Sequence, residues 1–431
     1  MNVLMFGWEF PPNISGGLGT ACQGIVKGLS ACKDIHVLFV IPKSFGNENT
    51  SHFELIDAEK VATTDKISFT EHSSSFSTIE ISSRLLPYQT PEDFSKQKHF
   101  SNREVVSTKQ IGQADSTTHH EFHFTGKYGP NLFDEINNYA VVARLIAKKH
   151  QFELIHVHDW LTFPAGIAAK QVSGKPLIAH VHSTDFDRSG GKINPSIYAI
   201  EKQGFEHADK IITVSNLIKR RIVEDYGISP TKITTVYNAI DPAKSNHSPK
   251  TKKKHTEKVV TFLGRITIQK GPEYFVEVAK LVLQRMKNVR FVMAGNGDMM
   301  AKMIELSAKY GISDKFQFAG FLKGAEVHQM LRISDVFIMP SVSEPFGIVP
   351  LEAMQVKVPV IISLQSGVAE LIKNVIKIDF WDIHAMVDAI HGIIRYKPLS
   401  KMMANEGKQE VDKLNWKLAA SHIRNIYLNL I

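Results

Sequence analysis

Cysteine is scarce in this chain: only Cys22 and Cys32 occur among 431 residues. Both fall in an apolar series with helical spacing, completed by Leu18, Ile25 and Leu29. A helix would hold the two sulfur atoms roughly 15 Å apart, because each residue adds about 1.5 Å, and a disulfide cannot span that distance. The sequence therefore excludes a disulfide-stapled scaffold, and two buried thiols fit a reducing cytoplasm.

Long hydrophobic runs are missing as well. No segment approaches the run of about 18 apolar residues that a membrane-spanning helix needs. The first residues contain no basic segment, and Trp8-Glu9 interrupts their apolar run, so they predict a first β-strand rather than a signal peptide. We accordingly expect a cytoplasmic protein.

The chain also lacks a strong excess of one charge. It has 51 basic and 43 acidic side chains, a net charge of +8, and 19 histidines. This modest positive balance suggests an anionic partner, and nucleotides, anionic lipid surfaces and nucleic acid are all compatible with it. The lysine-rich stretch Lys250–Lys254 has no aromatic neighbours of the kind that stack on bases, so we do not expect nucleic acid.

What the chain does have is enough length and apolar content, 43%, for two or three domains with large cores. Short apolar runs alternate with amphipathic stretches, which predicts parallel sheets covered by helices on both faces. One series of strands is predicted at 3–6, 35–41, 154–157, 177–181, 211–214 and 233–236. A second series follows at 259–263, 289–293, 316–318, 336–339 and 358–362, and this restart indicates two doubly wound α/β domains.

The predicted domains are residues 1–243 and 258–411, joined by a basic linker at 244–257 that reads as a solvated hinge. Residues 43–126 are too long and polar for an ordinary connection, so they form either an insertion with strands of its own, such as Phe76–Leu86, or a flap. A helical pattern from Trp416 onward predicts a terminal helix within residues 412–431.

A glycine-rich turn, Ser15-Gly16-Gly17-Leu18-Gly19-Thr20, follows the first strand and opens the first helix. Glycines at such a turn let backbone N–H groups approach a phosphate or a sugar at the positive end of the helix. The turn lacks the G-x-G-x-x-G spacing of a dinucleotide-binding protein, so a structural tight turn and a ligand site are equally compatible with it.

Two strand ends carry histidine pairs, His156/His158 followed by Asp159 and His180/His182 followed by Asp185. Residues two apart share one face of a strand, so each pair could be half of a metal site. We favour a structural role for His156 and His180 and a substrate role for His158 or His182, because ligands of open α/β sheets bind beyond the carboxyl ends of strands. The Asp185-Phe186-Asp187 tripeptide matches a D-x-D metal signature, but so short a match occurs by chance.

Two patterns in the second half indicate an anion and a sugar. Arg265 and Lys270 flank a turn before a helix that starts near Pro272, which suits a diphosphate, although solvated surface cations are the alternative. Glu344 and Glu352 straddle the next strand-to-helix turn, where the N–H groups of residues 346–348 are expected to be exposed. Carboxylates are good acceptors for vicinal sugar hydroxyls.

Taken in order, these motifs resemble the retaining nucleotide-sugar glycosyltransferases of GT-B fold, and within them the glycogen and starch synthase group. The resemblance covers nearly the whole chain and is carried by Gly16-Gly17, His158-Asp159-Trp160, His182-Ser183-Thr184, Val214-Ser215, Val236–Asp241, Arg265 with Lys270-Gly271, Gly295–Asp298 and the segment from Glu344 to Glu352. It implies two Rossmann-like domains that face a cleft, with the last helix crossing back to the first domain.

The resemblance also implies roles for single residues. His182, Glu344, Arg265 and Lys270 would form the catalytic group, with the two cations on the donor diphosphate and His182 beside the anomeric carbon. Donor contacts would come from Gly16, Gly17, Gly295, Phe346, Gly347, Ile348 and Glu352, and the acceptor side from His158 and Asp159. No metal and no cofactor are expected.

The implied reaction transfers glucose from ADP-glucose or UDP-glucose to a growing α-1,4-glucan with retained configuration. Ile14-Ser15 stands where bacterial ADP-glucose-using synthases have Lys-Thr, which leaves both donor nucleotides and other acceptors open. One alternative is the same chemistry on a lipid-linked or cell-surface oligosaccharide or a small acceptor, with peripheral membrane contact. A noncatalytic sugar-nucleotide or nucleic-acid binder is the alternative of another class.

Overall fold

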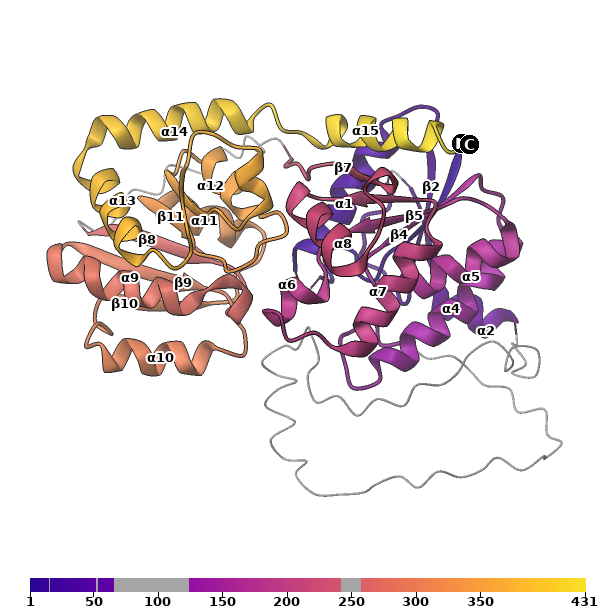
Figure 1. Ribbon diagram of the computed structural model, residues 1–431, viewed down its shortest axis with the longest axis horizontal. Helices are drawn as coiled ribbons and strands as arrows, with labels where there is room; N and C mark the ends of the chain where they lie inside the picture. Colours follow the sequence, from indigo (N-terminus) through magenta and orange to yellow (C-terminus); the bar gives the residue numbers. More distant parts are fainter. Residues whose placement is uncertain (15, 52, 66–123, 242–256) are drawn as a thin grey trace, which may run out of the picture.

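The computed structural model describes residues 1–14, 16–51, 53–65, 124–241 and 257–431. Within these residues, two all-parallel sheets stand side by side, each covered by helices (Figure 1). The predicted strands Phe76–Leu86 and nearly all of the predicted linker, 244–257, lie outside the described residues. The α/β fold with two Rossmann-like domains is therefore confirmed.

The strands of the two sheets agree with the predicted series to within a residue or two at their ends. In the described part of the first domain, seven strands follow the order β3 (Glu54–Asp57), β2 (His36–Ile41), β1 (Asn2–Phe6), β4 (Leu154–His158), β5 (Leu177–Val181), β6 (Lys210–Thr213) and β7 (Ile233–Thr235). In that of the second domain, six follow the order β10 (Phe316–Gly320), β9 (Val289–Ala294), β8 (Lys258–Leu263), β11 (Val336–Met339), β12 (Val360–Ser363) and β13 (Ile376–Ile378). The sequence did not predict β3 and β13, both of which are short strands at a sheet edge.

Helices lie in all described connections between consecutive strands except the one from β2 to β3. The first domain contains α1 (Gly17–Ser30), α2 (Ala58–Asp65), α4 (Leu132–Lys149), α5 (Phe163–Ser173), α6 (Asp185–Ser189), α7 (Pro195–His207), α8 (Asn216–Tyr226) and the 3-10 turn η2 (Pro230–Lys232). The second contains η3 (Ile268–Lys270), α9 (Pro272–Arg285), α10 (Met300–Lys309), α11 (Ala325–Ile333), α12 (Val349–Gln355), η4 (Gly367–Glu370), α13 (Ile383–Arg395) and α14 (Lys397–Val411). Pro272 occupies the first helical position of α9, as predicted, where its missing N–H costs nothing. No helix in the described residues is both long and apolar enough to cross a membrane.

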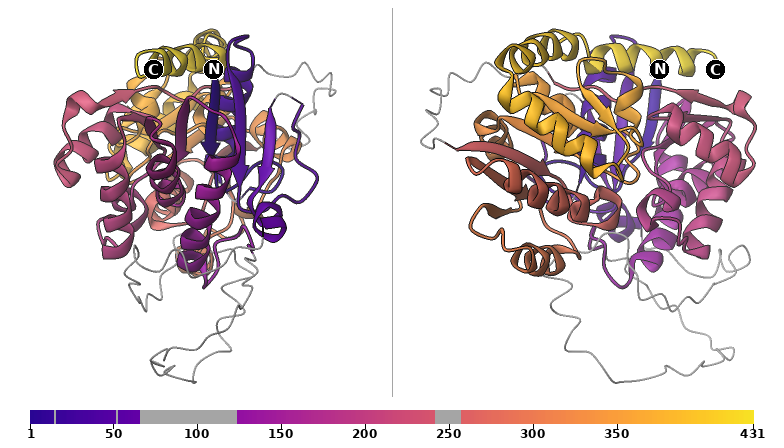
Figure 2. Two further views of the ribbon diagram at one scale, coloured as in Figure 1. Left: turned by 90° about the vertical axis from the view of Figure 1, so that its right-hand side faces the viewer. Right: turned by 60° about the vertical axis from the view of Figure 1, so that its left-hand side comes forward.

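The last helix, α15 (Trp416–Leu428), leaves the second domain and packs on the first, as predicted (Figure 2). It lies on α1, where Gly24 and Gly28 allow a close approach: a Cβ at Gly24 would stand 2.0 Å from the Trp416 ring, and one at Gly28 would stand 2.5 Å from the Trp416 carbonyl oxygen. Cys22 is a buried residue of α1, whereas Cys32 lies just beyond the end of that helix and is half-buried. Both thiols are free.

We expect Gly28→Ala to lower the free energy of unfolding by about 1–3 kcal/mol, because the new methyl group meets a backbone oxygen that cannot rotate away. Gly392→Ala is the matched control: this helical glycine of α13 has only Leu399 near a new Cβ, at 3.9 Å, so alanine should be neutral or stabilising. Urea unfolding of both variants measures the difference, and equal stabilities would contradict the close helix crossing.

Each sheet reverses its strand order beside its first strand, between β1 and β4 in the first domain and between β8 and β11 in the second. Ligands of doubly wound sheets bind at these switch points, outside the carboxyl ends of the strands. The Gly16-Gly17 turn and His158 follow β1 and β4, while Arg265 and Glu344 follow β8 and β11. The topology therefore brings the motifs to two switch points, one in each domain.

Candidate active site

Contacts across the domain boundary join the loops at these carboxyl ends. The Ser215 hydroxyl donates to the Pro345 carbonyl at 2.6 Å and accepts from the Ile218 N–H at the start of α8, at 3.3 Å. The Glu370 carboxylate accepts from the first two N–H groups of α8, those of Asn216 and Leu217, at 2.8 and 2.7 Å. The first turn of a first-domain helix is thus capped largely by the second domain, so the two switch points face each other.

The loop after β8 lies between the loops after β9 and β11. Its Ile266 N–H donates to the Asn296 carbonyl at 2.9 Å, and a Cβ at Gly295 would stand 1.8 Å from the Gly264 carbonyl oxygen. On the other side, Val342 donates its N–H to the Gln269 carbonyl at 2.9 Å. Gly295, with a φ of +138°, therefore supports the segment that carries Arg265, and no other residue fits there.

Lys270 and Glu344 form an ion pair. The ammonium group reaches Glu344 Oε2, and the buried Ser341 hydroxyl donates to the same oxygen at 3.4 Å. Both side chains are largely buried, with 19% and 8% of their surfaces exposed. A cation and a carboxylate that the sequence separates by more than seventy residues thus meet at the second switch point.

The turn between Glu344 and α12 presents free backbone donors. Within the described residues, the N–H groups of Phe346, Gly347 and Ile348 donate no hydrogen bond. Gly347 has a φ of +101°, and a Cβ there would stand 3.2 Å from Glu344 Cγ, so glycine is required both by conformation and by packing. Exposed N–H groups just before a helix form a site for anionic or hydroxylic oxygens.

Glu352 lies in the first turn of α12 and is partly buried. Its carboxylate has no hydrogen bond or ion pair among the described residues, and burial raises its pKa to about 7. A carboxylate held in low-dielectric surroundings without a protein partner is a typical feature of a ligand site.

We expect Glu352→Gln to stabilise the fold. The raised pKa means that ionisation of Glu352 costs the folded state stability above its ordinary pKa of 4.5. Glutamine removes that cost, so the increase in the free energy of unfolding should grow between pH 4.5 and 7 and reach at most about 3 kcal/mol at pH 8. Thermal unfolding at pH 5 and pH 8 measures it, with the exposed Glu406→Gln as the control. An equal shift at both pH values would contradict the buried carboxylate.

At the first switch point, Gly16 and Gly17 begin α1 with open space around them. Apart from the adjoining residues and the backbone of α1, a Cβ at either glycine would meet no atom of the described residues within 4 Å, and neither glycine has a left-handed φ. Neither packing nor backbone conformation therefore requires these glycines, which favours the ligand interpretation over a structural tight turn.

A residue that sequence reasoning missed, Glu9, holds this turn in place. Its buried carboxylate accepts from the Gly19 N–H at 3.2 Å and from the Tyr128 hydroxyl at 3.3 Å. The signal for it was present: Glu9 is a lone acid in an otherwise apolar run. Glu370, a residue of η4 whose carboxylate caps α8, was also missed, and nothing in its local sequence marks it.

Three histidines of β4 and β5, together with His182 just after β5, form a buried array on the sheet face that α1 and α15 cover. His156 Nε2 lies 3.1 Å from His180 Nδ1, and His158 Nδ1 lies 3.0 Å from His182 Nε2. Tyr427 of α15 hydrogen-bonds His156 Nδ1 at 2.5 Å. Burial lowers all four pKa values, those of His156 and His182 to about 3, so the imidazoles are neutral.

Asp159 has a left-handed φ of +58° directly after β4. Its buried Oδ1 accepts from the His182 N–H at 2.6 Å and from the Ser183 N–H at 3.3 Å, and desolvation raises its pKa to about 6. We assigned this residue to the acceptor side from the sequence. In the structure, the Asp159 carboxylate is hydrogen-bonded to the backbone of His182 and Ser183, so Asp159 orients the loop that carries His182.

The carboxylates of Asp185 and Asp187, the D-x-D match, accept hydrogen bonds from other groups of the protein. Asp187 accepts from the Thr184 N–H and hydroxyl at 2.9 and 2.8 Å, and from the Ser343 hydroxyl of the second domain at 2.7 Å. Asp185 accepts from the Asn194 N–H at 2.5 Å. These carboxylates have structural partners on α6 and at the domain boundary.

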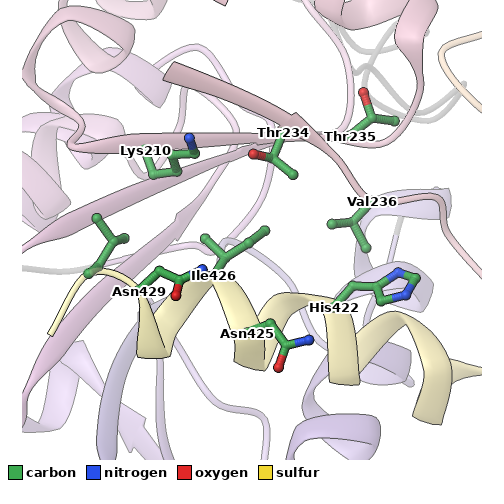
Figure 3. A pocket seen from close by; sticks show the side chains of 9 residues that line it. Lys210, Thr234, Thr235, Val236, His422, Asn425, Ile426 and Asn429 are labelled. Atoms are coloured by element: carbon green, nitrogen blue, oxygen red, sulfur yellow. The ribbon is translucent and has the colours of Figure 1, made fainter. Parts of the chain in front are cut away.

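One open groove lies apart from all of these residues. It has a volume of about 430 Å³ and lies between the C-terminal helix and the β6–β7 edge of the first sheet (Figure 3). Its lining consists of Lys210, Thr234, Thr235, Val236, His422, Asn425, Ile426, Asn429 and Leu430. No predicted site residue contributes to it, so the groove is separate from the candidate active site.

Comparisons with known proteins agree with this arrangement. Residues 243–410 match the family glycosyl transferases group 1, and residues 105–244 match glycosyltransferase family 4. An uncharacterized glycosyltransferase of Methanocaldococcus jannaschii is 27% identical over 445 residues, with 99% of this chain and 98% of the relative covered. The glycogen synthase of Mycobacterium tuberculosis is 23% identical over 443 residues, covering 99% of this chain and 94% of the relative.

Among solved structures, HepE of Anabaena, in complex with UDP and glucose, superposes with a TM-score of 0.67 at 14% identity and 99% coverage of both chains. At that identity the likeness shows the fold, which is GT-B. The chain is therefore a glycosyltransferase with the GT-B fold. Its second domain matches the model of the glycosyl transferases group 1 family.

Proposed function

We propose that the protein transfers glucose from ADP-glucose or UDP-glucose to a growing α-glucan, with retention of configuration at the anomeric carbon. One observation carries the proposal: the second switch point gathers the Lys270–Glu344 pair, the free N–H groups of residues 346–348 and the unpartnered Glu352 on adjoining loops. Together they offer a cation for a diphosphate, donors for sugar oxygens and a carboxylate for ribose hydroxyls.

The proposed roles follow from charge. Arg265 and Lys270 stabilise the negative charge that grows on the departing diphosphate, and this electrostatic stabilisation is the main catalytic contribution. Glu344 contacts the transferred sugar and keeps Lys270 in place before the donor binds. Glu352 accepts from the ribose hydroxyls, and Gly16 and Gly17 leave room for the donor phosphates to approach α1.

At the reacting carbon, the acceptor hydroxyl attacks the face from which the diphosphate leaves, and a phosphate oxygen of the leaving group takes its proton. This route needs neither the nucleophile nor the acid of a retaining glycosidase. His182, whose loop is held by Asp159, lies at the end of β5 toward the second domain and would position the sugar as a neutral hydrogen-bonding group.

The likeness to a glycogen synthase over nearly the whole chain supports the glucan as acceptor. The test supplies ADP-glucose or UDP-glucose with and without glycogen and measures nucleotide release. Release that depends on glycogen supports the proposal. Release with other acceptors only, such as a lipid-linked oligosaccharide, would replace the glucan by that acceptor, and no release with any pair would contradict the transferase site.

A further inference from the structure

Near the first switch point, the Cys22 thiol lies close to the imidazoles of His158 and His182. Cys22 lies on α1, His158 ends β4, and His182 follows β5, yet the sulfur and one nitrogen of each ring all lie within 4.8 Å of one another. The two rings contact each other through His158 Nδ1 and His182 Nε2, at 3.0 Å. Three segments far apart in the sequence thus place soft and borderline ligand atoms around one point.

The donor set is one that zinc prefers. Zn²⁺ binds imidazole nitrogen at about 2.0–2.1 Å and thiolate sulfur at about 2.3 Å, so tetrahedral geometry separates its ligand atoms by roughly 3.3–3.6 Å. The separation of 3.0 Å between the His158 and His182 nitrogens lies near these values, and the Cys22 sulfur lies within 4.8 Å of one nitrogen of each ring. Three protein ligands leave a fourth position for water.

The surroundings suit a metal as well. Cys22 and His158 are buried, and His182 reaches the surface with 9% of its area, which provides a path for an ion. His158 Nε2 and His182 Nδ1 have no hydrogen-bond partner among the described residues, so a ring flip would sacrifice no other contact.

We propose that Cys22, His158 and His182 form a Zn²⁺ site whose occupation inhibits the enzyme. On binding, the Cys22 S–H bond breaks, its proton passes to solvent and an S–Zn bond forms, while the two nitrogens exchange their mutual hydrogen bond for bonds to zinc. His182 is then unavailable to a sugar. The inhibitory effect rests on the proposed function, but the binding does not.

A second histidine group must be distinguished from this one. His156, His158 and His180 also lie within 4.8 Å of one another, but they contain no sulfur. The planes of the His156 and His180 rings lie within 13° of parallel, the two rings are hydrogen-bonded to each other, and the Tyr427 hydroxyl contacts the remaining nitrogen of His156. The thiol-containing group is therefore the better zinc site, and its sulfur gives it a spectroscopic signature.

The experiment measures metal binding without activity. Zn²⁺ is titrated by equilibrium dialysis, and Co²⁺ serves as a probe because a thiolate ligand produces a charge-transfer band in the near ultraviolet. Wild type and Cys32→Ser should bind one zinc and show the cobalt band. Cys22→Ser should lose the band and bind zinc at least roughly 100-fold more weakly, since it loses a charged ligand. Cys32 is the matched control, because it is the only other cysteine.

Activity assays then test inhibition. Cys22 makes none of the proposed substrate contacts, so Cys22→Ser should turn over normally without zinc and resist zinc concentrations that inhibit wild type and Cys32→Ser. Undiminished zinc binding by Cys22→Ser, or a cobalt complex without the thiolate band, would overturn the site. Zinc binding without inhibition would overturn the inhibitory role. Failure of the transferase reaction itself would leave the dialysis result intact, so the two proposals can fail separately.

Discussion

Lys270→Ala and Glu344→Ala should each lower turnover well over tenfold, a barrier increase above about 1.4 kcal/mol, while the protein stays folded. Lys270 is expected to hold the leaving diphosphate, and Glu344 is expected to contact the sugar. Loss of the ion pair is a second cause of the lower turnover, because either substitution leaves the other charged side chain without its partner in a largely buried place. Initial rates at saturating donor, with circular dichroism to verify folding, make the measurement.

Lys302→Ala provides the matched control for these variants. Lys302 pairs with Glu273 in the same domain, but its side chain is 63% exposed and lies in α10, away from the switch point. Its removal should leave turnover unchanged, as expected for an exposed ion pair. Near-normal turnover in both Lys270→Ala and Glu344→Ala would show that the second switch point does not hold the donor.

Acidification should unfold the protein steeply below about pH 4.5. The four histidines of the array are neutral in the folded state, with pKa values of about 3 for His156 and His182, whereas unfolded histidine titrates near 6.5. The unfolded chain therefore binds up to four more protons at low pH, so stability falls with decreasing pH at up to about 5 kcal/mol per pH unit.

Three carboxyl groups shift the onset of this loss. Burial raises the pKa of Glu201 and Glu352 to about 7 and that of Asp159 to about 6, so the folded state binds more protons than the unfolded state at these groups between about pH 4.5 and 7. In that pH range the three carboxyl groups offset most of the loss of stability that the four histidines cause. Below it the unfolded carboxyl groups are protonated too, and the histidine effect stands alone.

His180→Phe isolates the histidine contribution, since it removes one buried imidazole but keeps a ring in the stack. Its stability should fall less steeply below pH 4.5, by about 1.4 kcal/mol per pH unit, and the exposed His384→Gln should match wild type. Urea titrations between pH 3.5 and 7 give the slopes. A variant slope identical to wild type would show that His180 is charged in the folded state.

The strands that the sequence predicted are those with a continuous apolar run, because burial on both faces leaves that pattern in a parallel sheet. β3 and β13 escaped prediction for the same reason: each is short, stands at a sheet edge and carries a charged residue, Glu54 or Lys377, in its run. Local patterns also predicted α1, the start of α9 and α15.

The candidate site was predictable where its residues belong to one connection. Glu344 and Glu352 flank a single turn, and glycine and proline mark that turn in the sequence. The ion pair between Lys270 and Glu344, the cap that Glu370 places on α8 and the approach of Cys22 to His182 join segments that no local pattern relates. Such contacts follow from strand order and helix packing, which a single sequence does not reveal.

The position of α15 has a consequence for how the chain is synthesised. Trp416, Ala420, Ile423 and Tyr427 belong to the hydrophobic core of the first domain, although they follow the second domain in the chain. The ribosome therefore releases a first domain whose α1 surface and His156 are still uncovered, and the second domain completes its own sheet earlier. Folding of the domain that is made first should therefore end only after the second domain has been synthesised.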